Sequence, residues 1–137
     1  MSDGPYTRAQ ILLIKASEDE AALHADGNPD TVLGFHAQQA VEKLIKALLS
    51  QLAVPFELTH NLASLQAVLV AAGESLPATP LPLGELTDFA VTYRYDLLFQ
   101  VAGPDKAELI ETVRTIREHV VTRIAALSEA PLPPPLQ

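Results

Sequence analysis

Residues 34–52, GFHAQQAVEKLIKALLSQL, are the stretch that decides the fold of this chain. Apolar residues recur there at intervals of three and four, which predicts an α-helix with one buried stripe. No proline interrupts the run, and its one glycine stands at the start, so the helix can extend to the end of the stretch. The predicted buried stripe consists of Ala37, Ala40, Val41, Leu44, Leu48 and Leu52.

The opposite side of this helix is polar, and its role can be interpreted in two ways. Charged helix faces ordinarily lie in solvent, where Glu42 and Lys46, four residues apart, would form a favourable pair. Alternatively, His36, Gln39 and Lys43 share a face from which they would bind a phosphate group or contact a partner protein. The sequence leaves both interpretations open.

Four further helices are predicted around this one. Thr7 and Gln10 form a capping-box pattern at the start of the first of them. The turn signal DGNP at 26–29 and three prolines within 74–82 separate helices. Because no strand pattern or internal repeat is present, the expected fold is all-α, an antiparallel four-to-five-helix up-and-down bundle. The predicted helices cover residues 7–25, 30–52, 61–72, 83–99 and 104–127.

Two patterns within these helices predict which residues are buried. In the first helix, the run Glu18-Asp19-Glu20 is expected to be a solvated face, because runs of charge usually are. In the last helix, the residues expected to point inward are Ala107, Ile110, Val113, Val120, Ile124 and Leu127.

Length and charge limit the classes of function. The chain has 137 residues and a formal net charge of −8. One helical domain is predicted over 7–128, between a disordered lead-in at 1–6 and a proline-rich mobile tail at 129–137. The tail is interpreted as a terminus without function, with a ligand for a proline-reading module as the alternative. The acidic balance argues against binding to duplex DNA, although it leaves room for a small basic pocket.

Localisation and chemistry are limited in the same way. No apolar run approaches ~18 residues and no signal-peptide pattern is present, so a cytoplasmic protein without membrane contact is expected. The chain lacks cysteine and its four histidines form no HExxH motif, so no metal and no cofactor are predicted. His60 is expected to have a structural role, with its ring hydrogen-bonded to a backbone group of its own turn.

Three segments of the chain resemble a known family. GFHAQQAVEKLIKALL at 34–49, THNL at 59–62 and YRY at 93–95 are similar, in this order, to motifs of the HEPN domain of prokaryotic proteins. ASEDEAA at 16–22 resembles the AxxDxxxA stretch of that family. The resemblance covers about residues 7–127. It implies a four-to-five-helix bundle, usually a homodimer, with a polar cleft near the dimer interface.

The resemblance also implies two kinds of activity. Many relatives are encoded beside a minimal nucleotidyltransferase and form a toxin–antitoxin-like pair with it. Others are metal-independent ribonucleases with an Arg-x(4–6)-His motif, commonly RNxxxH, in which the His moves the 2′-OH proton and the Arg neutralises charge on the phosphate. In this chain Arg94 begins the matching segment, and Phe99 stands where the His would be.

Three functions are therefore considered. The preferred one is a homodimeric partner of a minimal nucleotidyltransferase that binds a nucleotide or RNA phosphate, has little or no nuclease activity and uses Arg94, Tyr95 and Asp96. The second is a metal-independent RNA-cleaving toxin with Arg114 and His119 as catalytic residues, a second literal match to the motif. Surface ion pairing with Glu111 and Glu118 is the simpler interpretation of Arg114. The third is a non-catalytic scaffolding helical dimer. The absence of a His at position 99 favours the first.

Overall fold

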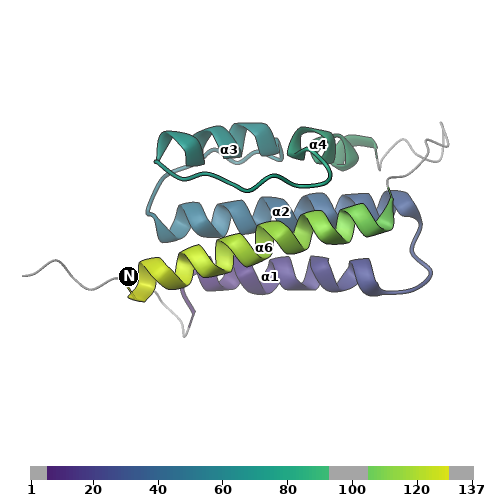
Figure 1. Cartoon of the computed structure of the whole chain (residues 1–137), viewed down its shortest axis with the longest axis horizontal. Helices are drawn as coiled ribbons and strands as arrows, with labels where there is room; N and C mark the ends of the chain where they lie inside the picture. Colours follow the sequence, from purple (N-terminus) through teal and green to yellow (C-terminus); the bar gives the residue numbers. More distant parts are fainter. Residues whose placement is uncertain (1–5, 93–104, 130–137) are drawn as a thin grey trace, which may run out of the picture.

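The computed structural model describes residues 6–92 and 105–129, and within them it contains five α-helices and no strand (Figure 1). The predicted all-α bundle is confirmed. The part of the fourth predicted helix that follows Thr92 lies outside the described residues. The helices are α1 (Arg8–His24), α2 (Asp30–Gln51), α3 (Leu62–Ala71), α4 (Leu83–Thr92) and α6 (Lys106–Glu129).

Local sequence sets the ends of α1 and α3. The Thr7 hydroxyl accepts a hydrogen bond from the Gln10 amide at 3.1 Å, and the Gln10 side chain accepts one from the Thr7 amide at 2.8 Å. This is the predicted capping box, which satisfies two amides that the helix leaves unpaired. Asn61 caps α3 by accepting a hydrogen bond from the Ser64 amide at 3.1 Å. Gly73 follows α3 with a φ of 89°, a left-handed conformation that favours glycine.

The central element of the bundle is α2, which contacts each of the other four described helices. Helices α1 and α6 lie on one side of it, and α3 and α4 lie on the other (Figure 1). A helix enclosed in this way buries residues around most of its circumference rather than along one stripe. The predicted stripe is buried, with Leu52 only partly so, and the further buried apolar residues of α2 are Leu33, Ile45, Ala47 and Leu49.

Two interpretations of polar surfaces fail for the same reason. The solvent-facing interpretation of the polar side of α2 is wrong for Gln38 and Glu42, which are 0% and 4% exposed. The acidic run of α1 was expected to be solvated, which is wrong for Asp19, 8% exposed, although Glu18 is exposed. Periodicity within one helix identifies an apolar stripe, but it does not show that neighbouring helices also cover polar positions.

Helices α2 and α6 run in the same direction, opposite to α1 (Figure 1). The side chains of Gln51 and Ser128, near the ends of α2 and α6, form a hydrogen bond of 3.4 Å. Arg117 of α6 donates a hydrogen bond of 3.1 Å to Glu20 of α1. The start of α1 and the ends of α2 and α6 therefore lie at the same end of the bundle.

The packing of α6 confirms part of its predicted burial. Ile110 and Leu127 are partly buried, as is usual at the edge of a helix face, but Ala107 is exposed and its predicted inward position is wrong. The buried apolar residues follow intervals of four, three, four and four, which keep them on one face. They are Leu109, Val113, Ile116, Val120 and Ile124.

Candidate functional site

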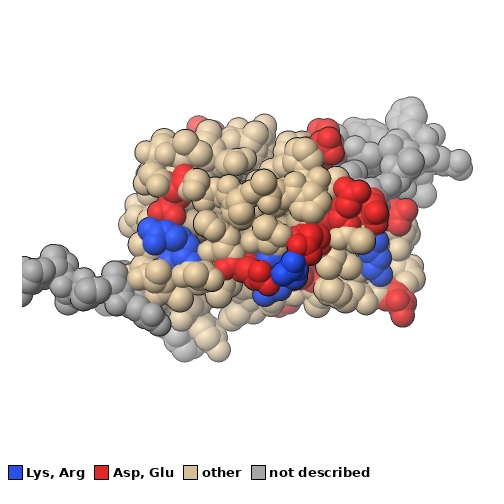
Figure 2. Space-filling model, in the orientation of Figure 1, with Lys and Arg blue, Asp and Glu red and all other residues tan. Residues whose placement is uncertain are grey.

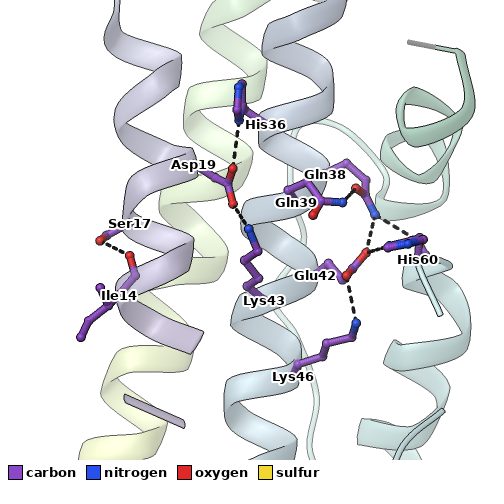
Figure 3. A network of polar contacts seen from close by, with 10 residues as sticks. All are labelled: Ile14, Ser17, Asp19, His36, Gln38, Gln39, Glu42, Lys43, Lys46 and His60. Carbon is purple, nitrogen blue, oxygen red and sulfur yellow. Dashed lines mark hydrogen bonds and ion pairs between the residues drawn. The ribbon is translucent and has the colours of Figure 1, made fainter. Parts of the chain in front are cut away.

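The polar residues of α2 gather around two carboxylates, one on each side of the helix (Figure 3). The first carboxylate is that of Asp19 in α1. Its Oδ1 lies 2.9 Å from Nδ1 of His36, and its Oδ2 accepts a hydrogen bond from Nζ of Lys43 at 2.5 Å. A buried charge is tolerated when it is paired and hydrogen-bonded, and both conditions hold for Asp19. These three residues, the Asp19 cluster, join α1 to α2.

The second carboxylate is that of Glu42, which joins α2 to the connector before α3. Its Oε1 lies 2.8 Å from Nδ1 of His60 and accepts a hydrogen bond of 3.0 Å from Nε2 of Gln38. Its Oε2 accepts a hydrogen bond of 2.9 Å from Nζ of Lys46, the predicted helical pair. Gln38 also donates to the His60 carbonyl at 2.9 Å. We call these four residues the Glu42 cluster.

The Glu42 cluster corrects the expected partner of His60. The ring of His60 contacts a carboxylate of α2, 18 positions earlier in the chain, instead of a backbone group of its own turn. Burial raises the pKa of Glu42, whereas the hydrogen bonds with Lys46, His60 and Gln38 lower it. The hydrogen bonds together outweigh burial, so the pKa of Glu42 lies below the ordinary value. Glu42 is therefore an ionised group whose charge is balanced by its neighbours.

The three α2 residues predicted to bind a phosphate are engaged with protein groups. His36 and Lys43 both contact Asp19, and Nε2 of Gln39 donates a hydrogen bond of 2.7 Å to Oε1 of Gln38. A phosphate at this position would compete with the Asp19 carboxylate for both basic groups. Phosphate binding by these residues stays a prediction.

The predicted catalytic pair Arg114 and His119 has two separate environments on α6. The Arg114 guanidinium donates hydrogen bonds to Glu111 and to Glu118, the latter at 2.9 Å, and these bonds raise the pKa of Arg114. The predicted surface ion pairing is therefore confirmed. Within the described residues, Nε2 of His119 is buried and has no hydrogen-bond partner. A catalytic role for the two residues stays a prediction.

The third predicted group, Arg94, Tyr95 and Asp96, lies outside the described residues, as does Phe99. In 6–92 and 105–129, no group of three or more His, Asp or Glu side chains is arranged to hold a metal ion. None of the helices in these ranges combines the length and the apolar character needed to cross a bilayer.

Acidic and basic side chains alternate on the face shown in Figure 2, where the blue groups lie next to red ones. A continuous basic surface, which nucleic-acid backbones require, does not appear on that face. In the described part of the chain, the Lys and Arg side chains paired with a carboxylate are Lys43, Lys46, Arg114, Arg117 and Arg123.

The burial of Asp19 has a signal in the sequence that the surrounding charges conceal. Asp19 follows Ala16 by three positions and precedes Leu23 by four, and both of these residues are buried. That spacing places Asp19 on the buried face of α1. Gln38 and Glu42 are four positions apart and share a face of α2 in the same way, but no pattern within the chain pairs them with His60.

Comparison with known proteins gives one match. A family model described as HEPN domain matches residues 9–124. The matched range includes the Asp19 cluster, the Glu42 cluster and the Arg114 ion pairs. No curated protein and no solved structure matches the chain.

Proposed function

This chain belongs to the HEPN domain family, and we propose that it is a non-nucleolytic homodimer that partners a minimal nucleotidyltransferase in a toxin–antitoxin-like pair. A nucleotide or RNA phosphate would bind on the side of Arg94, Tyr95 and Asp96. The resemblance to relatives encoded beside such enzymes supports the pairing. The proposed lack of nuclease activity is based mainly on the environment of Arg114.

Arg114 lies between two carboxylates, which makes it a poor phosphate ligand. An arginine that stabilises a phosphate transition state must direct its positive charge at the reacting group. Here one guanidinium is shared by Glu111 and Glu118, so the local charge is negative and repels a phosphate. Exposed ion pairs are weak, so these bonds alone would not prevent Arg114 from turning toward a phosphate. Catalysis is disfavoured because the two glutamates repel the phosphate.

His119 is equally unsuited to the transfer of a 2′-OH proton. A general base must come within hydrogen-bond reach of the proton that it removes. Nε2 of His119 is buried, and Arg114 lies five residues earlier on the same helix, about 140° around its axis. One phosphate could not contact both side chains of a single chain without rearrangement of α6.

The nuclease part of the proposal is tested by incubating the purified protein with end-labelled RNA in the absence of divalent metal. His119→Ala and Arg114→Ala variants are assayed beside it. We expect no cleavage above the protein-free control for any of the three proteins. Cleavage by the unmodified protein that both variants lose would identify Arg114 and His119 as a working pair and overturn this part of the proposal.

The binding and assembly parts of the proposal need separate measurements. Equilibrium dialysis with labelled ATP should detect binding that Arg94→Ala weakens at least tenfold and that the control Arg8→Ala leaves unchanged. Equal binding by the two variants would remove Arg94 from the site.

Sedimentation should give a homodimer, and a 14.7 kDa monomer at every concentration would contradict it. Co-expression with a nucleotidyltransferase encoded beside it should yield a complex, and separate elution of the two proteins would contradict the pairing.

A further inference from the structure

Two open hollows of about 380 Å³ each flank Pro55 and Phe56, where the chain leaves α2. One hollow extends toward α3. The other, which we call the Phe56 hollow, lies between the end of α2, the connector and the start of α1. Most of its lining is apolar, and nothing in the described residues fills it. It is lined by Arg8, Ser50, Ala53, Val54, Pro55 and Phe56.

The end of α6 lies beside the Phe56 hollow. Ser128, in the last turn of α6, shares a hydrogen bond with Gln51, and Gln51 is next in the chain to Ser50 of the lining. Helix α6 ends at Glu129, and the eight residues that follow in the sequence are APLPPPLQ at 130–137.

The chemistry of this segment fits the hollow. It has no charged side chain, and its four prolines favour a polyproline II helix, which rises about 3.1 Å per residue and spans about 25 Å over eight residues. Proline-rich segments bind in grooves lined by aromatic rings. Phe56 offers a half-buried ring, and the guanidinium carbon of Arg8 lies 5.1 Å from the centre of that ring.

We propose that residues 130–137 bind in the Phe56 hollow of their own chain, with prolines packed against the Phe56 ring. Because the segment is covalently attached to α6, even a weak intrinsic affinity would keep it bound most of the time. A segment joined directly to α6 has an effective concentration on the order of 1 mM, so an intrinsic Kd of about 0.1 mM would keep the contact about 90% formed. Proline also loses little conformational entropy on binding. The contact would hold together the start of α1 and the ends of α2 and α6, and it does not depend on the proposed function.

The absence of tryptophan from the chain allows a direct test. Phe56→Trp places a single fluorophore at the hollow, in the full chain and in a chain that ends at Glu129. Removing a contact that is about 90% formed should raise acrylamide quenching of the introduced indole roughly twofold. The synthetic peptide APLPPPLQ, added to the shortened protein at millimolar concentration, should restore protection. His24→Trp, on an exposed position at the opposite end of α1, is the matched control and should respond to neither change.

Two fluorescence results would overturn the proposal. One is equal quenching of the Phe56→Trp fluorophore in the full and shortened chains, without a response to the peptide. The other is protection that disappears on dilution, which would show that the segment comes from a second copy. Backbone amide NMR shifts of residues 53–57, compared between the full and shortened chains with Phe56 retained, provide the same test if Phe56→Trp disturbs folding. Unchanged shifts would also contradict the contact.

Discussion

The Glu42 cluster and the Arg114 ion pairs use the same chemistry in two different environments. In both, carboxylate oxygens lie close to basic side chains, at 2.9 Å for Lys46–Glu42 and for Arg114–Glu118. The Glu42 side chain is 5% exposed, whereas that of Glu118 is 54% exposed. Equal distances therefore correspond to unequal energies, because water can replace the partner at the surface and cannot do so in the interior.

This contrast has a functional side. Buried groups such as Glu42 and Asp19 hold α2 against its neighbours, and a ligand of their basic partners would have to compete with these carboxylates. The motif residues that identify the family in this chain thus include several with a structural role. Phosphate binding by His36, Gln39 and Lys43 stays a prediction, and the side of Arg94 is the ligand site that we propose.

The largest expected effect comes from removing the buried carboxylate in Glu42→Ala. The substitution leaves Lys46 as an uncompensated charge and removes one of the two acceptors of the Gln38 amide, so the free energy of unfolding should fall by about 3–5 kcal/mol in urea titrations. Glu118→Ala is the surface control and should lower it by only a small fraction of that amount. Equal losses in the two variants would remove the contrast between interior and surface.

A smaller effect is expected for Asp19→Ala, which sharpens the comparison within the interior. The partners His36 and Lys43 keep 31% and 26% of their side-chain exposure, so water can partly solvate them once Asp19 is gone. We expect a loss of about 2 kcal/mol in the free energy of unfolding, measured by thermal or urea unfolding. Glu18→Ala, at the exposed neighbouring position, should change it by less than about 0.5 kcal/mol. If Asp19→Ala lowers the free energy of unfolding as little as Glu18→Ala does, the Asp19 cluster does not hold α1 against α2.

The smallest effect concerns pH and compares Glu42→Gln with the unmodified protein. Because the pKa of Glu42 is lowered in the folded state, ionised Glu42 contributes stability above its ordinary pKa of 4.5. That contribution is lost as the pH falls below 4.5 and through the folded-state pKa. The unmodified protein should be more stable by about 1 kcal/mol at pH 7, and the difference should shrink in urea titrations at about pH 4 and pH 3. A difference that does not change with pH would show that Glu42 is not the ionised centre of its cluster.

Much of the fold could be predicted from the sequence, because it depends on interactions between neighbouring residues. The capping box of Thr7 and Gln10, the turn at 26–29 and the apolar spacing of α2 are all local signals. The candidate site could be predicted only in part. The Arg114 ion pairs join residues three and four positions apart, whereas the contact between Glu42 and His60 joins residues 18 apart that no periodic pattern connects.

The sequence by itself determined the helical class of this protein, its family motifs and the apolar stripe of α2, since each arises within a few turns of one helix. Only the tertiary structure decided that α2 is enclosed on both sides, and hence that Asp19, Gln38 and Glu42 are buried. The physical reason is that a polar residue carries the same local pattern on an exposed face and on a covered one. Whether it is desolvated depends on which helices pack against it, and whether it is tolerated there depends on partners that the fold brings from elsewhere in the chain.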